Sequence, residues 1–90
     1  MAAGDVNSRT VLNGNVKVLT GTLEAANGTA VALFDTNTYI VACWVQNADD
    51  QEGAQVELNT NDGSATVNGS IYVTSAAADV DTWNYTCLFI

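Results

Sequence analysis

The chain has 90 residues, enough for one domain, and its 48% of hydrophobic residues is too many for a disordered segment. Ten acidic residues stand against only two basic ones, Arg9 and Lys17, and the resulting net charge of −8 argues against binding to nucleic acid or to an anionic membrane surface. Histidine is absent, which removes the side chain that most readily transfers protons near neutral pH.

Apolar and polar residues alternate with a period of two along the chain, and no ten-residue stretch has a helical period. This pattern predicts an all-β single domain over residues 1–90, built as an antiparallel β-sandwich or small barrel of about seven strands. The expected strands are Val6–Leu12, Asn15–Leu23, Thr29–Phe34, Thr38–Gln46, Gln55–Asn59, Ala65–Thr74 and Thr82–Ile90. Residues 1–12 are polar enough to form an N-terminal arm or an edge strand instead of a core strand.

The alternation also predicts which side chains of the later strands face inward. Buried positions are expected at Val56, Leu58, Val67, Ile71 and Val73, and exposed positions at Gln55, Glu57 and Thr66. Asn68-Gly69 interrupts Ala65–Thr74 with a dipeptide that favours a two-residue hairpin turn. We favour one long strand, because the inward set stays in phase through the glycine, and the hairpin is the alternative.

Two expected strands are apolar on both faces. In Thr38–Gln46 the pattern places Tyr39, Val41, Cys43 and Val45 on one side and Ile40, Ala42 and Trp44 on the other. In Thr82–Ile90 it places Trp83, Tyr85, Cys87 and Phe89 on one side, with Leu88 and Ile90 opposite. Either loops cover the second face, or another subunit does. We favour a subunit interface, with Tyr39, Trp44, Trp83, Tyr85 and Phe89 as candidate contacts.

Cys43 and Cys87 are the only cysteines, and both lie in apolar strand patterns. Free cysteine is among the most buried residue types, so two packed thiols are the favoured interpretation. A disulfide is the alternative, and it requires that the strands bring the two side chains together.

The acidic residues do not form a recognisable reactive site. The run from Asn47 to Gly53 has oxygen ligands of the kind that calcium binds, but not the spacing of a calcium loop, and a solvated turn explains it better. Asp79 and Asp81 could act as an acid and base pair, although 90 residues can hardly build the cleft that glycoside hydrolysis needs. Two cysteines without histidine leave a zinc shell incomplete. We therefore expect no enzymatic activity, no metal and no cofactor.

From its opening Met-Ala-Ala-Gly-Asp-Val, through a turn-rich middle, to Trp-Asn-Tyr-Thr-Cys-Leu-Phe-Ile at residues 83–90, the chain resembles small virion proteins of tailed bacteriophages. These include capsid decoration, or cement, proteins, which are compact β domains that sit as oligomers on the capsid. A second resemblance is to the β-sandwich tips of phage fibres and to H-type lectins. In these, a strand with an aromatic and aliphatic end closes a trimer.

The resemblance implies a structural virion protein that binds the major capsid protein on the outer shell as a homotrimer. Its location would be the capsid surface, after synthesis in the host cytoplasm, since the first residues do not look like a signal peptide. Arg9 and Lys17 are the candidate capsid contacts. The alternative function is a trimeric carbohydrate-binding or receptor-binding tip.

Overall fold

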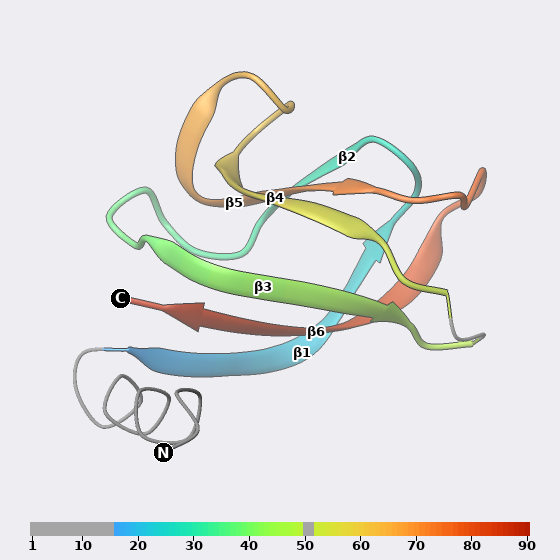
Figure 1. The fold of residues 1–90 in the computed structure, drawn as a ribbon, viewed down its shortest axis with the longest axis horizontal. Coiled ribbons are helices and arrows are strands. Elements are labelled where there is room, and N and C mark those ends of the chain that lie inside the picture. The colour runs from blue at the N-terminus through green and yellow to red at the C-terminus, as the bar shows by residue number, and fades with distance from the viewer. Residues whose placement is uncertain (1–15, 50–51) are drawn as a thin grey trace, which may run out of the picture.

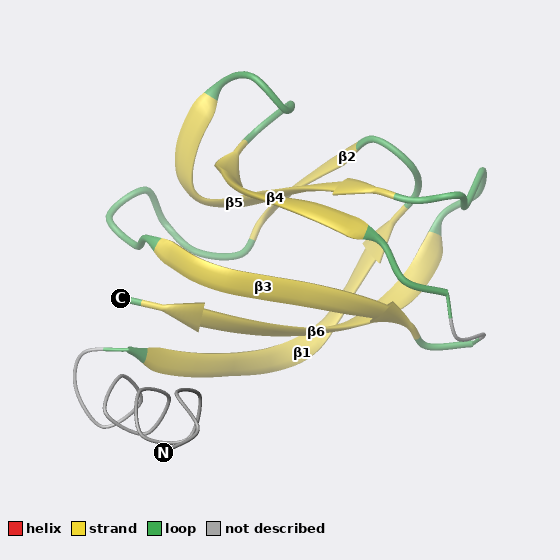
Figure 2. Cartoon of the chain, viewed as in Figure 1, coloured by secondary structure: helices red, strands yellow, loops and turns green. Residues whose placement is uncertain are grey.

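The computed structural model describes residues 16–49 and 52–90, which form six β-strands and no helix (Figures 1 and 2). The strands are β1 (Lys17–Ala25), β2 (Thr29–Ala32), β3 (Ile40–Asn47), β4 (Gln55–Thr60), β5 (Thr66–Thr74) and β6 (Asp81–Phe89). The all-β prediction is confirmed. The expected strand Val6–Leu12 and the N-terminal arm lie outside the described residues. Within the part that the structure describes, no helix is present that could cross a membrane.

The strands form two antiparallel sheets of three strands each, in the orders β1-β6-β3 and β2-β5-β4. The first sheet lies below the second in Figure 1. Core side chains come from both sheets, with Leu23, Ile40 and Trp83 from the first and Ile71 and Val73 from the second. The two sheets therefore pack face to face as a sandwich, whose apolar interior follows from the inward positions of each strand.

β5 runs unbroken through Asn68-Gly69, as the long-strand prediction required, and the hairpin alternative is wrong. Gly69 has a φ of +81°, in the left-handed region that favours glycine. Its carbonyl accepts hydrogen bonds from the backbone N–H groups of Leu33 and Phe34, both at 3.0 Å. The glycine thus lets the chain that follows β2 close on β5, which is why a turn-forming dipeptide occurs inside a strand.

Burial follows the predicted phase, but its depth depends on the position of each strand in its sheet. Ile71 and Val73, on the central strand β5, are fully buried, whereas Val56 and Leu58, on the edge strand β4, are half-buried. Val67 is half-buried although it is on β5, because it lies outside the stretch Ser70–Val73 that pairs with β2. The polar partners Gln55, Glu57 and Thr66 are exposed as predicted.

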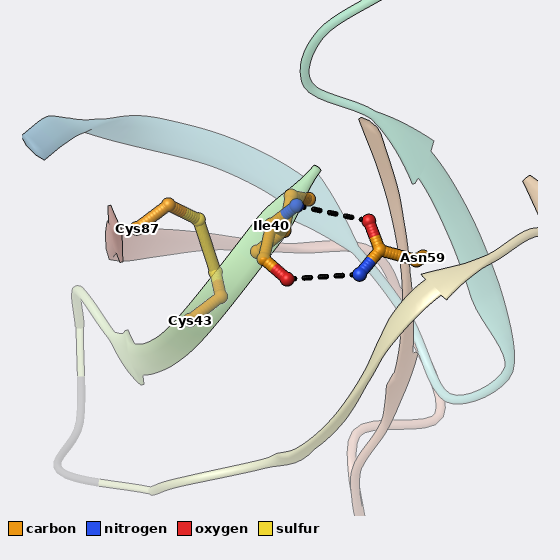
Figure 3. Close-up of a disulfide and its surroundings, with 4 residues drawn as sticks. All are labelled: Ile40, Cys43, Asn59 and Cys87. Atoms are coloured by element: carbon orange, nitrogen blue, oxygen red, sulfur yellow. Dashed lines mark hydrogen bonds between the residues drawn. A yellow bond between two sulfur atoms is a disulfide. The ribbon is translucent and has the colours of Figure 1, made fainter. Parts of the chain in front are cut away.

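Asn59 joins the two sheets through its buried side chain. Its Oδ1 accepts a hydrogen bond from the Ile40 N–H at 3.0 Å, and its Nδ2 donates to the Ile40 carbonyl at 2.8 Å (Figure 3). The same Oδ1 accepts a longer bond from the Gly69 N–H at 3.3 Å. One amide from β4 therefore pairs with the backbone of β3 as a neighbouring strand would.

Cys43 and Cys87 form a disulfide between the adjacent strands β3 and β6 (Figure 3). The two residues stand directly opposite each other in the antiparallel register, which is why their sulfur atoms can meet. The interpretation of both as free packed thiols is therefore wrong. No free cysteine remains, since the sequence contains only these two.

Candidate interaction surface

Large apolar side chains gather on the face of the β1-β6-β3 sheet that looks away from the core. Six large hydrophobic residues are exposed among those described, and five of them lie on this face. The apolar face, as we call it, consists of Val18, Tyr39, Val41, Ala42, Trp44, Leu88 and Ile90. Trp44 is 54% exposed and Tyr39 is 51% exposed, so two large aromatic side chains lie together with the exposed aliphatic residues of this face.

The strand register places these residues together. Directly opposite residues share a face in an antiparallel sheet, so Val18, Leu88 and Ala42 form one row across the three strands. Trp44 begins the next row, opposite Thr86. Tyr39 and Ile90 exchange both backbone hydrogen bonds, at 3.0 and 2.9 Å, and extend the apolar face beyond the ends of β3 and β6.

A register shift in β3 exposes part of this surface. The pairing with β6 slips between Ile40 and Ala42, which leaves Val41 as an extra residue. Ile40 is fully buried, Val45 is buried, and Val41 is exposed. The predicted sides therefore hold only within each half of the strand. Val41 does lie opposite Ile40, but Tyr39 and Val41 share a side with Trp44 instead of Val45, because the bulge reverses the alternation between Ile40 and Ala42.

The apolar face contains no charged residue, although the chain is strongly acidic. Other members of the same sheet surface are neutral and polar, and Glu24 is the exception at the far end of β1. The other carboxylates in the described residues lie away from this surface. Glu57 is on the second sheet and Asp81 is at the start of β6, and the rest are in the connections between strands, at Asp35, Asp49, Glu52, Asp62 and Asp79. The surface is thus apolar at one end and neutral over most of its length.

The structure separates the five predicted interface residues into two groups. Tyr39 and Trp44 lie on the apolar face, whereas Trp83, Tyr85 and Phe89 lie on the inward row of β6. Trp83 is completely buried and donates a hydrogen bond from Nε1 to the Ala25 carbonyl at 2.9 Å. Trp83 is therefore a core residue of the single chain, and the prediction that it contacts another subunit is wrong.

The other two inward aromatic residues are half-buried. Tyr85 lies over Gly21, where a Cβ would come within 3.0 Å of the tyrosine oxygen. Phe89 packs against Phe34 with ring centroids 4.3 Å apart. Both contacts are made within one chain, so an aromatic residue in an apolar strand was not enough to identify an interface.

Of the candidate capsid contacts, Lys17 is exposed at the first position of β1, and Arg9 lies outside the described residues. Lys17 precedes Val18 in β1, so the alternation of the strand places its side chain on the opposite side of the sheet from the apolar face, in the row of Phe89. The structure places no described acidic residue in the register row of Lys17, which pairs with Phe89.

The acidic segments have structural partners. Asn47 is buried, donates from Nδ2 to the Asp81 carboxylate at 3.0 Å, and accepts from the Asp49 N–H at 2.8 Å through Oδ1. These bonds shape the connection from β3 toward β4. No group of three or more potential metal ligands occurs in residues 16–49 and 52–90, and Asp50 lies outside that part of the chain.

The sequence analysis placed Leu88 and Ile90 on the second apolar face of their strand without naming them as contacts, and it missed Val18 entirely. Their signal was an apolar residue on the side of the strand opposite the core row, but only the register shows that the three strands bring such residues together.

Comparison with protein-family models, curated proteins and solved structures finds no match for this chain.

Proposed function

We propose that this protein is a non-enzymatic structural component of a virion, a bacteriophage capsid decoration protein that binds the outer shell and stabilises it as a homotrimer. The observation that supports the proposal best is the uncovered apolar face of a small acidic β-sandwich. Large apolar side chains scattered singly over a surface are ordinary, whereas a contiguous group of them bordered by polar residues marks a surface that meets another molecule.

The charge distribution fits a protein that is displayed in many copies. Carboxylates in the strand connections keep the exposed parts of neighbouring copies soluble and apart. The major capsid protein is the proposed partner, and Lys17 is the described residue that can pair with acidic groups on it. Exposed ion pairs contribute about 0.2–1 kcal/mol each, so repetition over the copies of an oligomer is needed for a useful effect.

The test is attachment to capsids. Purified protein is added to capsids that lack it, over a series of salt concentrations, and the bound fraction is measured by co-sedimentation. We expect saturable binding and greater resistance of the decorated capsids to heat. Failure to bind at any salt concentration would exclude the decoration function.

Lys17→Gln tests the polar contribution, and Thr66→Glu is the matched control, because it also lowers the net charge by one, at an exposed residue on the other sheet. We expect Lys17→Gln to weaken attachment severalfold more than Thr66→Glu. Equal effects would remove the specific role of Lys17 while leaving the decoration function in place.

A carbohydrate-binding or receptor-binding tip is the second candidate, and it is favoured by one specific arrangement. Exposed Trp44 is followed two residues later on the same face by Gln46, which lies opposite exposed Asn84. An aromatic surface beside neutral amides could stack on a sugar ring and bond to its hydroxyls. A glycan array separates the two functions. A decoration protein should bind no glycan on the array, whereas a tip should bind particular sugars, and Trp44→Ala should abolish that binding.

A further inference from the structure

We propose that the apolar face is the contact between copies of this chain, and that it turns toward the axis of the oligomer. This proposal rests on the proposed function in one respect, namely that the functional protein is an oligomer. Of the surface features that the structure describes, this one combines exposure, apolar character and absence of charge. The occupant that we assign to it is a second copy of the chain.

Charge determines which occupant fits. Each copy carries a net charge of −8, so two copies repel each other when their acidic connections approach. Contact through the apolar face brings uncharged surfaces together, and Glu24 lies at the opposite end of β1 from Val18. A basic partner would gain attraction at the acidic connections and none at this face. A second copy presents the same neutral, apolar surface, so contact through this face places no charged side chain of the apolar face against another.

The size of the sheet sets the expected strength. Three strands at spacings of about 4.8 Å and nine residues at about 3.3 Å give a sheet face of about 400 Å² in projection. Stable interfaces bury about 800 Å² on each partner. The assembly is therefore expected to be reversible and to depend on protein concentration. Trp44 and Tyr39 are the side chains that contribute most, since aromatic residues dominate such contacts.

The experiment measures the molar mass of the isolated protein by sedimentation velocity from low micromolar to submillimolar concentration. Trp44→Glu places a charge in the apolar face. Val80→Glu is the matched control, because Val80 is 67% exposed but belongs to the connection between β5 and β6. We expect the parent and Val80→Glu to form species of more than one copy. We expect Trp44→Glu to need at least tenfold higher concentration for the same association.

Val18→Asp is a second variant on a different strand of the face, and it should behave as Trp44→Glu does. Circular dichroism identifies any variant that fails to fold, and the conclusion then depends on the other one. A parent that stays a single copy at every concentration would overturn the assignment. So would equal weakening by Trp44→Glu and Val80→Glu, because added charge alone would then explain the loss. A single-copy parent would also remove the homotrimer from the proposed function, whereas binding to the outer shell is decided separately by the capsid test.

Discussion

Asn59 combines two properties at one position, a backbone in the left-handed region and a side chain with both a donor and an acceptor. Its φ is +54°, which asparagine tolerates better than most residues. Its amide satisfies the backbone N–H and carbonyl of Ile40, which is completely buried. Few other side chains could adopt this conformation and also pair with an extended backbone.

Replacing Asn59 with alanine is expected to lower the free energy of unfolding by about 3 kcal/mol. The change leaves buried backbone groups without partners, and each such group costs about 1–3 kcal/mol. Urea unfolding followed by tryptophan fluorescence measures the loss. Asn59→Gly removes the same bonds but relieves the backbone, so it should be less destabilising by about 1 kcal/mol. An alanine variant as stable as the parent would show that water replaces the amide.

Asp62 should make stability depend on pH in the acidic range. Its carboxylate accepts hydrogen bonds from the backbone of Ala65, at 2.7 Å, and from the backbone and hydroxyl of Ser64, at 2.9 and 2.8 Å. These bonds lower the pKa of Asp62 below its ordinary value, with the Ala65 bond as the largest cause.

A carboxyl group whose pKa is lower in the folded state stabilises the fold above its ordinary pKa and loses that effect as the pH falls through the lowered value. The carboxylate is fully exposed, so the effect is small. We expect the urea midpoint of Asp62→Asn to lie slightly below that of the parent near neutral pH and to approach it below about pH 4. A difference that does not change with pH would contradict this explanation.

The packing of β5 against the chain that follows β2 requires a glycine at position 69. A Cβ at this position would collide with the backbone carbonyl oxygen of Asp35 and would lie 2.8 Å from that of Phe34. Both oxygens belong to the backbone and cannot rotate away as a side chain can.

Gly69→Ala is therefore expected to destabilise the protein by about 3 kcal/mol, from the positive φ and the steric overlap together. Gly53→Ala is the matched control, since nothing lies within 4 Å of a Cβ there, and it should change stability by less than about 0.5 kcal/mol. Chemical unfolding of the two variants gives the comparison. Similar values for both would mean that the connection after β2 can move away from β5.

The disulfide joins two neighbouring strands that are 44 residues apart in sequence. Closing a loop of this length removes conformational freedom from the unfolded chain, which corresponds to about 4 kcal/mol in the chain-entropy description. Adding a reductant should therefore lower the urea midpoint of the parent. The double variant Cys43→Ala/Cys87→Ala should be less stable and insensitive to the reductant. A parent that does not respond would mean that its thiols are not bonded in solution.

The excess of acidic residues should oppose folding, because the folded chain brings their negative charges closer together. Ten acidic and two basic side chains cannot be arranged so that most carboxylates are paired. Salt screens such repulsion, with a Debye length of about 10 Å at 0.1 M. We expect the thermal midpoint to rise by a few degrees between low and moderate sodium chloride concentration. A lower midpoint in salt would show that attractive pairs dominate instead.

The sequence was sufficient to predict strands and their phase wherever the alternation was regular. Gln55 and Glu57 point outward, and Ile71 and Val73 inward, as the alternation predicts. The strand is continuous through Gly69, although Ser70, next to inward Ile71, is also buried. These features depend on neighbouring residues within one strand. The all-β class follows from them without any knowledge of which strands pair.

Features that depend on pairing between distant strands could not be predicted. The extra residue at Val41 shifts the phase of β3, and only the register with β6 reveals it. The disulfide needs Cys43 directly opposite Cys87, and the amide of Asn59 needs Ile40 beside it in the other sheet. The apolar face was anticipated as an excess of apolar residues, but its members could be named only from the order of three strands.

The position of β6 has a consequence for synthesis. β6 is the last strand in the sequence and the middle strand of its sheet, pairing with β1 on one side and β3 on the other. Among the strands that the structure describes, β1 and β3 therefore lack their sheet partner until β6 is made, whereas β2, β4 and β5 have all been made by then. The β2-β5-β4 sheet can therefore form first, before β6 is present to pair with β1 and β3. The newly made chain is thus most exposed to misassembly just before its final strand arrives.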